Sequence, residues 1–261
     1  MNKILAACGV MFAALTCRAD VQVSASLSNF HFTLVDLNPG DGIAPYITLA
    51  GGQLVGKLWA TTPTGMTDQL TASTQAPLAS FSRNLISEGQ TGEFRIDTSS
   101  LASLSFESHV SSSLGASGGA YSPNETGANA LAYSIFTLSP NTKLEITADA
   151  KLQANSGVAG VQTFHNTVLA TAYINVSTLI NFPVADVLQK SIDEEGGSFS
   201  FSEARTLSVT FVNGWSREET IYTTMFANAE QQAAPVPEPG TTSMLFCGAC
   251  LMGLLVIRQR Q

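Results

Sequence analysis

A strict alternation of apolar and polar residues constrains the fold of this chain more than any other feature of its sequence. The clearest case is the segment 144–152, where apolar residues hold the even positions and Glu145, Thr147, Asp149 and Lys151 hold the odd ones. Successive side chains of a β-strand point to opposite faces, so this segment predicts a strand with one dry and one wet face. The same period of two recurs in the segments 30–34, 104–114, 168–176 and 207–211.

Turn-forming residues separate the predicted strands. Pro140, within Ser139-Pro-Asn-Thr, predicts a hairpin between the segments 131–138 and 143–152. Asn213-Gly214 predicts a second hairpin between 206–212 and 215–226, although its register stays open because a two-residue loop would mix apolar and charged residues on one face. Residues 115–129 and 194–197 are predicted loops, and 183–190 make one short helix at most. The pattern therefore predicts an all-β fold, an antiparallel β-sandwich of jelly-roll type.

Residues 1–19 have the features of a secretory signal peptide. A basic start at Lys3 precedes the uncharged apolar stretch 4–15, and the small residues Cys17 and Ala19 fit a cleavage site before Asp20. We therefore expect Sec-type export and removal of residues 1–19 by signal peptidase. Lipoprotein processing at Cys8 and a retained N-terminal anchor are both disfavoured. Almost no apolar region precedes Cys8, and the apolar run is short for a membrane span.

The C-terminal segment combines three elements in a fixed order. Pro237-Glu238-Pro239 cannot join a helix or an inner strand, because proline lacks an amide hydrogen. An uncharged apolar run follows at residues 241–257, near the short end of a transmembrane helix, and then a basic tail at 258–261 with Arg258 and Arg260. The positive-inside rule places such a tail in the cytoplasm. Residues 229–236 are polar and Pro-rich, and predict a tether between residues 20–228 and this segment.

This order at the extreme C-terminus closely resembles the PEP-CTERM sorting signal, a resemblance that covers residues 237–261 only. It implies that the protein is an exported substrate of exosortase in a Gram-negative bacterium, with Pro237, Glu238 and Pro239 as the sorting motif. It also implies transient anchoring in the inner membrane, followed by delivery to the cell surface or extracellular matrix. A non-enzymatic structural or adhesive role in exopolysaccharide matrix or biofilm is the function that it implies.

Composition restricts what the predicted domain at 20–228 can do. All four cysteines, Cys8, Cys17, Cys247 and Cys250, lie in the two terminal segments, so the domain has no disulfide and no thiol chemistry. The C-x-x-C spacing of Cys247 and Cys250 is disfavoured as a metal or redox site, because no second pair exists and the run is apolar. The chain has a formal net charge of −8, and several of its basic residues lie in the terminal segments. This acidity argues against nucleic acid as a partner, and no cofactor is predicted.

Two groups of residues suggest catalysis, and both suggestions are weak. Gly115-Ala-Ser117-Gly-Gly has the G-x-S-x-G pattern, with Asp149 and His165 in the chain order of an α/β-hydrolase triad. However, that serine needs a strand before it and a helix after it, and the proline at position 123 disfavours the helix. Glu107, Glu145 and Asp149 could be nominated as glycosidase carboxylates, but the sequence gives no separation between them. We expect no enzymatic activity, and a polysaccharide-active hydrolase is the least favoured alternative.

Two other groups suggest binding. Asp36, Asn38 and Asp41 could offer oxygen ligands to calcium from a glycine-containing loop, although the same residues commonly form consecutive turns. Trp59 and Trp215 are the only tryptophans, and either could stack on a sugar if its ring were exposed, although a core position is the commoner outcome. A carbohydrate-binding or calcium-dependent surface module is therefore the main alternative function. Tyr46, Tyr121 and Tyr222 are available aromatic partners without a linking spacing.

Overall fold

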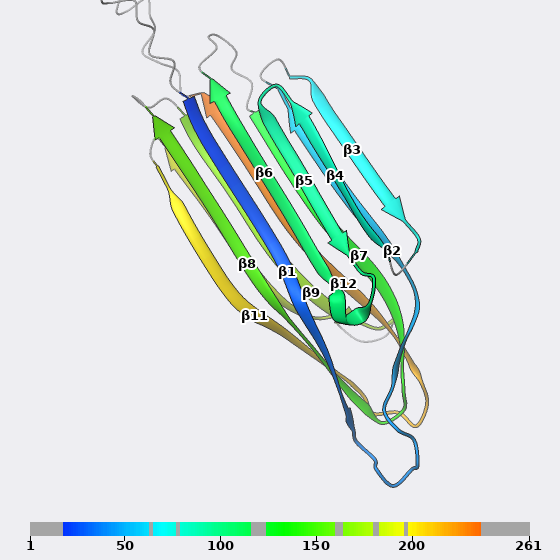
Figure 1. Ribbon diagram of the computed structural model, residues 1–261. Coiled ribbons are helices and arrows are strands. Elements are labelled where there is room, and N and C mark those ends of the chain that lie inside the picture. The colour runs from blue at the N-terminus through cyan, green and yellow to red at the C-terminus, as the bar shows by residue number, and fades with distance from the viewer. Residues whose placement is uncertain are drawn as a thin grey trace, which may run out of the picture.

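Two six-stranded sheets make up the fold (Figure 1). The computed structural model describes residues 18–62, 65–76, 79–115, 124–159, 164–179, 183–195 and 198–235. Sheet I contains, in spatial order, β11 (Ser200–Asn213), β8 (Thr142–Ala159), β1 (Arg18–Asp36), β6 (Ser105–Gly115), β5 (Gln90–Asp97) and β4 (Ser80–Ser87). Sheet II contains β10 (Val184–Glu195), β9 (Phe164–Ser177), β12 (Glu219–Pro235), β7 (Asn124–Leu138), β2 (Ile47–Thr61) and β3 (Thr67–Thr74).

The predicted antiparallel β-sandwich is confirmed. Neighbouring strands in both sheets pair antiparallel. The helical structure in the described residues is the short 3₁₀ turn η1 (Leu101–Ser103). The alternation of apolar and polar residues that predicted the strands corresponds to an alternation of buried and more exposed side chains. On β8, Leu144, Ile146 and Ala148 are fully buried, whereas their odd-numbered neighbours face solvent.

The sandwich is elongated, and its two ends differ. β12 has 17 residues, which corresponds to about 56 Å of extended chain. β1 begins and β12 ends at the same end, where Arg18 pairs with Ala159 of β8 and Pro235 pairs with Phe164 of β9. We call this the chain-terminus end. At the opposite end, which we call the tip, the β1–β2, β7–β8 and β11–β12 connections meet (Figure 1).

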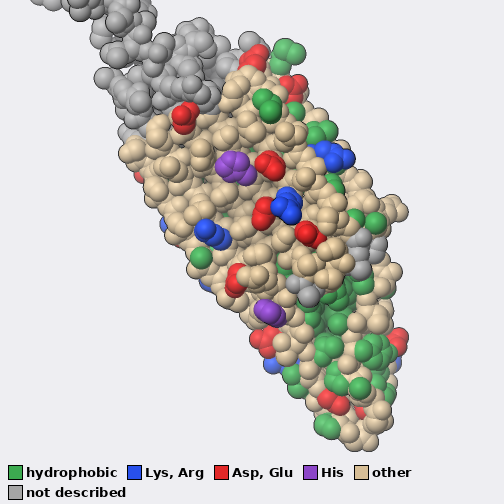
Figure 2. Space-filling view, in the orientation of Figure 1, with side chains coloured by type: hydrophobic (Ala, Val, Ile, Leu, Met, Phe, Trp, Pro, Cys, Tyr) green, Lys and Arg blue, Asp and Glu red, His purple; other side chains and the backbone are tan. Residues whose placement is uncertain are grey.

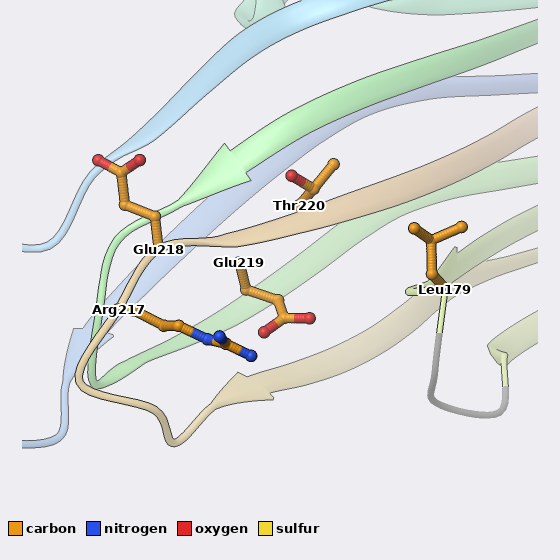
Figure 3. A pocket seen from close by; sticks show the side chains of 5 residues that line it. All are labelled: Leu179, Arg217, Glu218, Glu219 and Thr220. Carbon is orange, nitrogen blue, oxygen red and sulfur yellow. The ribbon is translucent and has the colours of Figure 1, made fainter.

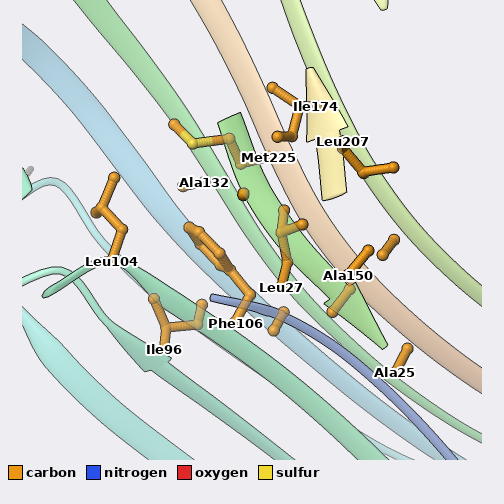
Figure 4. Packing of buried hydrophobic residues seen from close by; sticks show 14 of the residues in the cluster. Ala25, Leu27, Ile96, Leu104, Phe106, Ala132, Ala150, Ile174, Leu207 and Met225 are labelled. Carbon is orange, nitrogen blue, oxygen red and sulfur yellow. The ribbon is translucent and has the colours of Figure 1, made fainter. Parts of the chain in front are cut away.

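Apolar side chains from the inner faces of both sheets form one core (Figure 4). Its largest fully buried members include Phe94 and Phe106 of sheet I and Phe136 of sheet II. Alanine supplies much of the remaining inner surface, with Ala128, Ala130 and Ala132 on β7 and similar runs on β8, β9 and β12. At Gly56 of β2 a ring from the opposite sheet fills the space of the missing side chain: an added Cβ would lie 2.0 Å from Cζ of Phe94.

Both predicted hairpins are wrong as strand pairings. The turn at Pro140 connects β7 of sheet II to β8 of sheet I, and the Asn213-Gly214 turn connects β11 of sheet I to β12 of sheet II. In each case the chain reverses direction but crosses between the sheets. The two strands of each pair therefore lie in different sheets, and their hydrogen-bonding partners are other strands. This crossing removes the conflict in register that a two-residue loop at Asn213 would have caused.

Three further boundaries differ from prediction. The segment 184–190 is part of edge strand β10, paired along its length with β9, and not a helix. Residues 124–129, predicted as loop, begin β7. Residues 229–235, predicted as tether, complete β12, which pairs with β7 and β9 on its two sides. Ala229, Gln231 and Ala233 are buried there, on the face that points toward the other sheet.

Most of the two terminal segments lies outside the described residues. This applies to residues 1–17 of the expected signal peptide and to the whole segment 236–261, with its sorting motif, its apolar run and Arg258 and Arg260. Within the described residues, no helix has the length and apolar character that crossing a membrane requires.

Candidate binding surfaces

Trp59 lies on the outer face of sheet II, near the chain-terminus end. Its half-buried indole covers Gly127 of the neighbouring strand β7, where an added Cβ would lie 1.9 Å from the ring. The ring nitrogen donates a hydrogen bond of 2.9 Å to Oε1 of Glu125, and Nζ of Lys57 lies 5.2 Å from the ring centroid. The glycine allows the ring to rest against the sheet, so the core position considered for this tryptophan is not the one it takes.

Trp215 lies at the tip and is 60% exposed. Its backbone is fixed by neighbouring loops: its N–H donates to Oδ1 of Asn213 (3.1 Å), and its carbonyl accepts from the N–H of Asn141 (3.0 Å). The guanidinium carbon of Arg217 lies 6.0 Å from the ring centroid, within reach of a cation–π contact. An exposed ring on a well-anchored loop can act as a contact residue.

The structure does not bring the two tryptophans together. Trp59 is opposite Gly127, near the start of β7. Trp215 accepts a hydrogen bond from Asn141, which follows the last residue of β7, Leu138. The intervening stretch of β7 corresponds to roughly 35 Å. The two residues therefore cannot form one sugar-binding site, and each must be considered with its own neighbours.

The tip also holds the loop that was considered for calcium. Oδ1 of Asp36 accepts a hydrogen bond from the N–H of Asn38 (2.8 Å), so this pair forms a turn. Asp41 accepts from the N–H of Ile43 (2.8 Å) and from Nδ2 of Asn141 (2.9 Å). These two hydrogen bonds, that of Ile43 first, lower the pKa of Asp41 and keep its carboxylate ionised. Among the described residues, no group of three His, Cys, Asp or Glu side chains is placed to hold a metal ion.

We expect a calcium chelator to leave the melting temperature of the protein unchanged. The carboxylates of Asp36 and Asp41 already accept hydrogen bonds that shape the loop, so a cation would have to displace those donors. Differential scanning calorimetry in EDTA and in millimolar calcium provides the measurement. A higher melting temperature in calcium, abolished by Asp36→Ala, would show instead that the ion binds the folded state by mass action.

A shallow pocket of about 260 Å³ lies beside Trp215 at the tip, lined by Leu179, Arg217, Glu218, Glu219 and Thr220 (Figure 3). The Tyr46 hydroxyl, one of the aromatic residues noted in the sequence, donates to the carboxylate of Glu218. That hydrogen bond raises the pKa of Tyr46. The tip thus combines the exposed indole of Trp215 with a nearby polar pocket, and the hydrogen bonds of Tyr46 and Asp41 join its loops.

The structure does not assemble the residues suggested for catalysis. Asp149 lies on the outer face of sheet I, where it accepts hydrogen bonds from Nδ2 of Asn29 and Oγ1 of Thr206, both at 3.0 Å. These bonds, that of Asn29 first, lower its pKa. The backbone of His165 belongs to β9 of sheet II, and Ser117 lies outside the described residues. Glu107 and Glu145 lie on β6 and β8, two strands that β1 separates.

Sequence reasoning missed a group of aromatic side chains on the outer face of sheet II. In one register across four strands, Val55, Leu131, Phe226 and Tyr173 lie side by side. Tyr133, on the next outward position of β7, is 48% exposed. We call the following outward residues of sheet II the aromatic face: Trp59, Leu131, Tyr133, Tyr173, Tyr222 and Phe226. The strand alternation was the available signal, because it assigns these residues to outward positions, opposite in parity to their buried neighbours.

Comparison with sequence families decides the identity of the C-terminal segment. The family described as "PEP-CTERM protein-sorting motif" matches residues 235–261. The chain carries a PEP-CTERM motif. The resemblance seen in the sequence is therefore confirmed, and the motif begins at the residue where β12 ends. A PEP-CTERM motif supports an exported protein that exosortase sorts in a Gram-negative-type cell envelope.

The remaining comparisons add little. No curated protein matches the chain. One solved structure is described as "Structural basis for the promiscuous specificity of the carbohydrate-binding modules from the beta-sandwich super family". It is 11% identical to this chain, with 80% of this chain and 96% of that one covered, and a TM-score of 0.08. At that TM-score the likeness carries no argument.

Proposed function

We propose that this protein is a non-enzymatic component of the cell surface or exopolysaccharide matrix, with a structural or adhesive role. The PEP-CTERM motif at residues 235–261 carries the proposal, because it marks the sandwich as cargo for export and exosortase sorting. The inner-membrane anchor at residues 241–257 is temporary in this proposal. Signal peptidase removes residues 1–19 during export.

The arrangement of the sandwich supports display at a surface. The motif follows β12 at the chain-terminus end, and the tip lies at the far end of strands as long as about 56 Å. A protein held through its C-terminus would therefore present Trp215 and the tip loops away from its attachment. The outer face of sheet II would stand between the two and be open to other matrix components.

A carbohydrate-binding surface module is a second candidate function. The observation that favours it is the aromatic face, which places five aromatic rings on one side of the sandwich. Aromatic rings beside polar groups are the usual composition of a surface that binds sugars. This candidate is compatible with an adhesive role, since binding a polysaccharide is one way to hold a matrix together.

Deletion of residues 237–261 tests the proposed function. In the producing bacterium, we expect the full-length protein to fractionate with the cell surface or matrix, and the shortened one to be lost from it. Matrix cohesion, measured as resistance of the biofilm to shear, should fall in the deletion strain as it does in a strain without the protein. Gln259→Ala, a change in the same segment outside the Pro-Glu-Pro element, is the matched control.

Two results would contradict this function. Unchanged cohesion in a strain without the protein would remove the structural role, and release of sugars from matrix polysaccharide by the purified protein would make it an enzyme.

A further inference from the structure

We propose that the aromatic face binds a neutral polysaccharide chain lying across the strands of sheet II. This inference deepens the proposed function, on which it rests, by naming the partner class and the surface that contacts it. The ligand is defined by its chemistry: sugar rings with apolar C–H faces, many hydroxyl groups and no charge.

The distribution of aromatic residues distinguishes the two outer faces of the sandwich. Trp59, the tyrosines of the described strands and Phe226 all point outward from sheet II. Among the described residues of sheet I, by contrast, every phenylalanine of a strand points inward. The outer face of sheet I is mainly polar (Figure 2), and its exposed large apolar side chains are the aliphatic Val35, Ile86 and Val212. Five aromatic side chains gathered on one outer face, one exposed and four half-buried, are typical of a surface that contacts a partner.

The rings are held in positions that suit stacking. Trp59 rests on Gly127, so one side of the indole is against the sheet. Tyr173 and Phe226 are cross-strand neighbours with ring centroids 5.0 Å apart and an interplanar angle of 36°. Tyr133 is 48% exposed on the adjoining strand. Rings fixed in this way lose little conformational entropy when a sugar ring stacks on them, which favours binding.

Two amide oxygens on this face lack a protein donor. Oδ1 of Asn228 and Oδ1 of Asn175 are buried and have no hydrogen-bond partner among the described residues. Asn228 is only 7% exposed, and its Nδ2 donates to Oε1 of Glu230 at 3.0 Å. Nδ2 of Asn175 donates to the Tyr173 hydroxyl at 2.7 Å. A buried acceptor without a donor is costly, and rotation of either amide toward the surface would let a hydroxyl-rich ligand supply the missing donor.

Charge selects a neutral ligand over an acidic one. A shallow depression of about 200 Å³ lies near Trp59, and Glu125 and Glu230 both line it, together with Thr167, Leu169 and Gln232. The two carboxylates outnumber the single Lys57 ammonium beside Trp59, so the local charge repels the uronate groups of an acidic polysaccharide, and the chain as a whole has a net charge of −8. Hydroxyl groups, in contrast, can donate to both carboxylates.

A second copy of the chain is a less suitable occupant. Two aromatic faces in contact would bring two copies of a chain with a net charge of −8 together. They would also bring the carboxylates of Glu125 and Glu230 out of water, which is unfavourable for unpaired charges. A polysaccharide satisfies the acceptors and leaves the edges of the face hydrated.

Affinity gel electrophoresis tests the inference with the protein as cells release it. We expect a neutral galactomannan or β-glucan in the gel to retard the protein, and alginate to have no effect. Tyr133→Ala should weaken the retardation about tenfold in dissociation constant, which corresponds to loss of a stacking contact of about 1.4 kcal/mol. Phe226→Ala provides a second variant of the face. Trp215→Ala at the tip and His109→Ala on the outer face of sheet I are the matched controls, and melting temperatures verify folding.

Three results would overturn the inference. The first is no retardation by any neutral polysaccharide, and the second is retardation that Trp215→Ala removes while Tyr133→Ala does not. The third is concentration-dependent self-association that Tyr133→Ala abolishes, which would make the face an interface between copies. If matrix cohesion still depends on the protein while the gels show no binding, this inference fails and the proposed function stands. If the gels show binding but matrix cohesion does not depend on the protein, this inference stands and the proposed structural role fails.

Discussion

Replacing Gly56 by alanine should destabilise the sandwich by about 3 kcal/mol, although it adds a single methyl group. Gly56 points inward from β2, and three ring atoms of Phe94 occupy the space of the missing side chain, at 2.0, 2.1 and 2.4 Å from an ideal Cβ. Phe94 is fully buried and comes from the opposite sheet, so its ring can move only by disturbing the core. For a domain of this size, the melting temperature should fall by roughly 6 to 12 °C.

Gly51→Ala is the matched control for this prediction. It lies on the same strand, and its nearest neighbouring atom is Cδ1 of Ile135 at 4.0 Å from the added Cβ. Phe94→Leu combined with Gly56→Ala should recover part of the loss, because a smaller side chain leaves room for the methyl group. Thermal unfolding followed by circular dichroism provides the measurement. Equal melting temperatures for Gly56→Ala and Gly51→Ala would show that Phe94 does not fill the position of the missing side chain.

The strands themselves were predictable because the signal for them is local. On β8 the alternation from Leu144 to Leu152 fixes which side chains are buried, and burial decides which face of the strand is inward. The contact between Gly56 and Phe94 was not predictable. These residues belong to different sheets, and nothing near either of them in the sequence indicates that they meet.

The pairing of the strands could not be predicted from the sequence, for a related reason. Pro140 and Asn213-Gly214 indicate where the chain reverses, and both reversals are present. A turn signal does not say whether the next strand joins the same sheet or crosses to the other, because hydrogen-bonding partners are chosen by the packing of all strands. The end of β12 shows a similar limit. Its alanines and glutamines read as a polar tether, yet Ala229 and Ala233 are buried between neighbouring strands.

The binding surfaces were predictable only in part. Rarity drew attention to Trp59 and Trp215, and both contribute exposed or half-buried rings at the surface. Tyr133, Tyr173 and Phe226 are less conspicuous in the sequence, and their importance depends on being neighbours across β7, β9 and β12. Each had the outward parity of its strand, but only the order of strands in sheet II places the three together.

Substitution of Glu238 by alanine should stop processing of the C-terminal segment. The structure adds a constraint to this expectation: Pro235 is still paired with Phe164 in sheet II, so Val236 alone separates the sandwich from Pro237-Glu238-Pro239. The two prolines of the motif have no amide hydrogen with which to extend the ladder of β12. Proline is disfavoured inside a central strand, so we do not expect the motif to extend β12, and we expect the processing enzyme to engage it next to the folded domain.

A membrane anchor at residues 241–257 would explain why processing is needed for release. Residues 241–257 would rise about 25 Å as a helix, slightly short of a hydrocarbon core of about 30 Å. Arg258 and Arg260 can reach the cytoplasmic headgroups and hold that orientation. A permanent anchor would need this span and these arginines but would gain nothing from Pro237-Glu238-Pro239, so we expect the mature protein to lack everything beyond a point near Pro239.

Intact-mass spectrometry of protein recovered outside the inner membrane provides the measurement. The unmodified chain should have lost the apolar run and basic tail, Glu238→Ala should remain full-length in the inner membrane, and Gln259→Ala should be processed normally. We expect the loss of processing in Glu238→Ala to be nearly complete, because a transmembrane helix that is not cleaved would not leave the bilayer. Mature protein that still carries residues 251–261 outside the inner membrane would refute processing, and the sandwich would then reach the surface by another route.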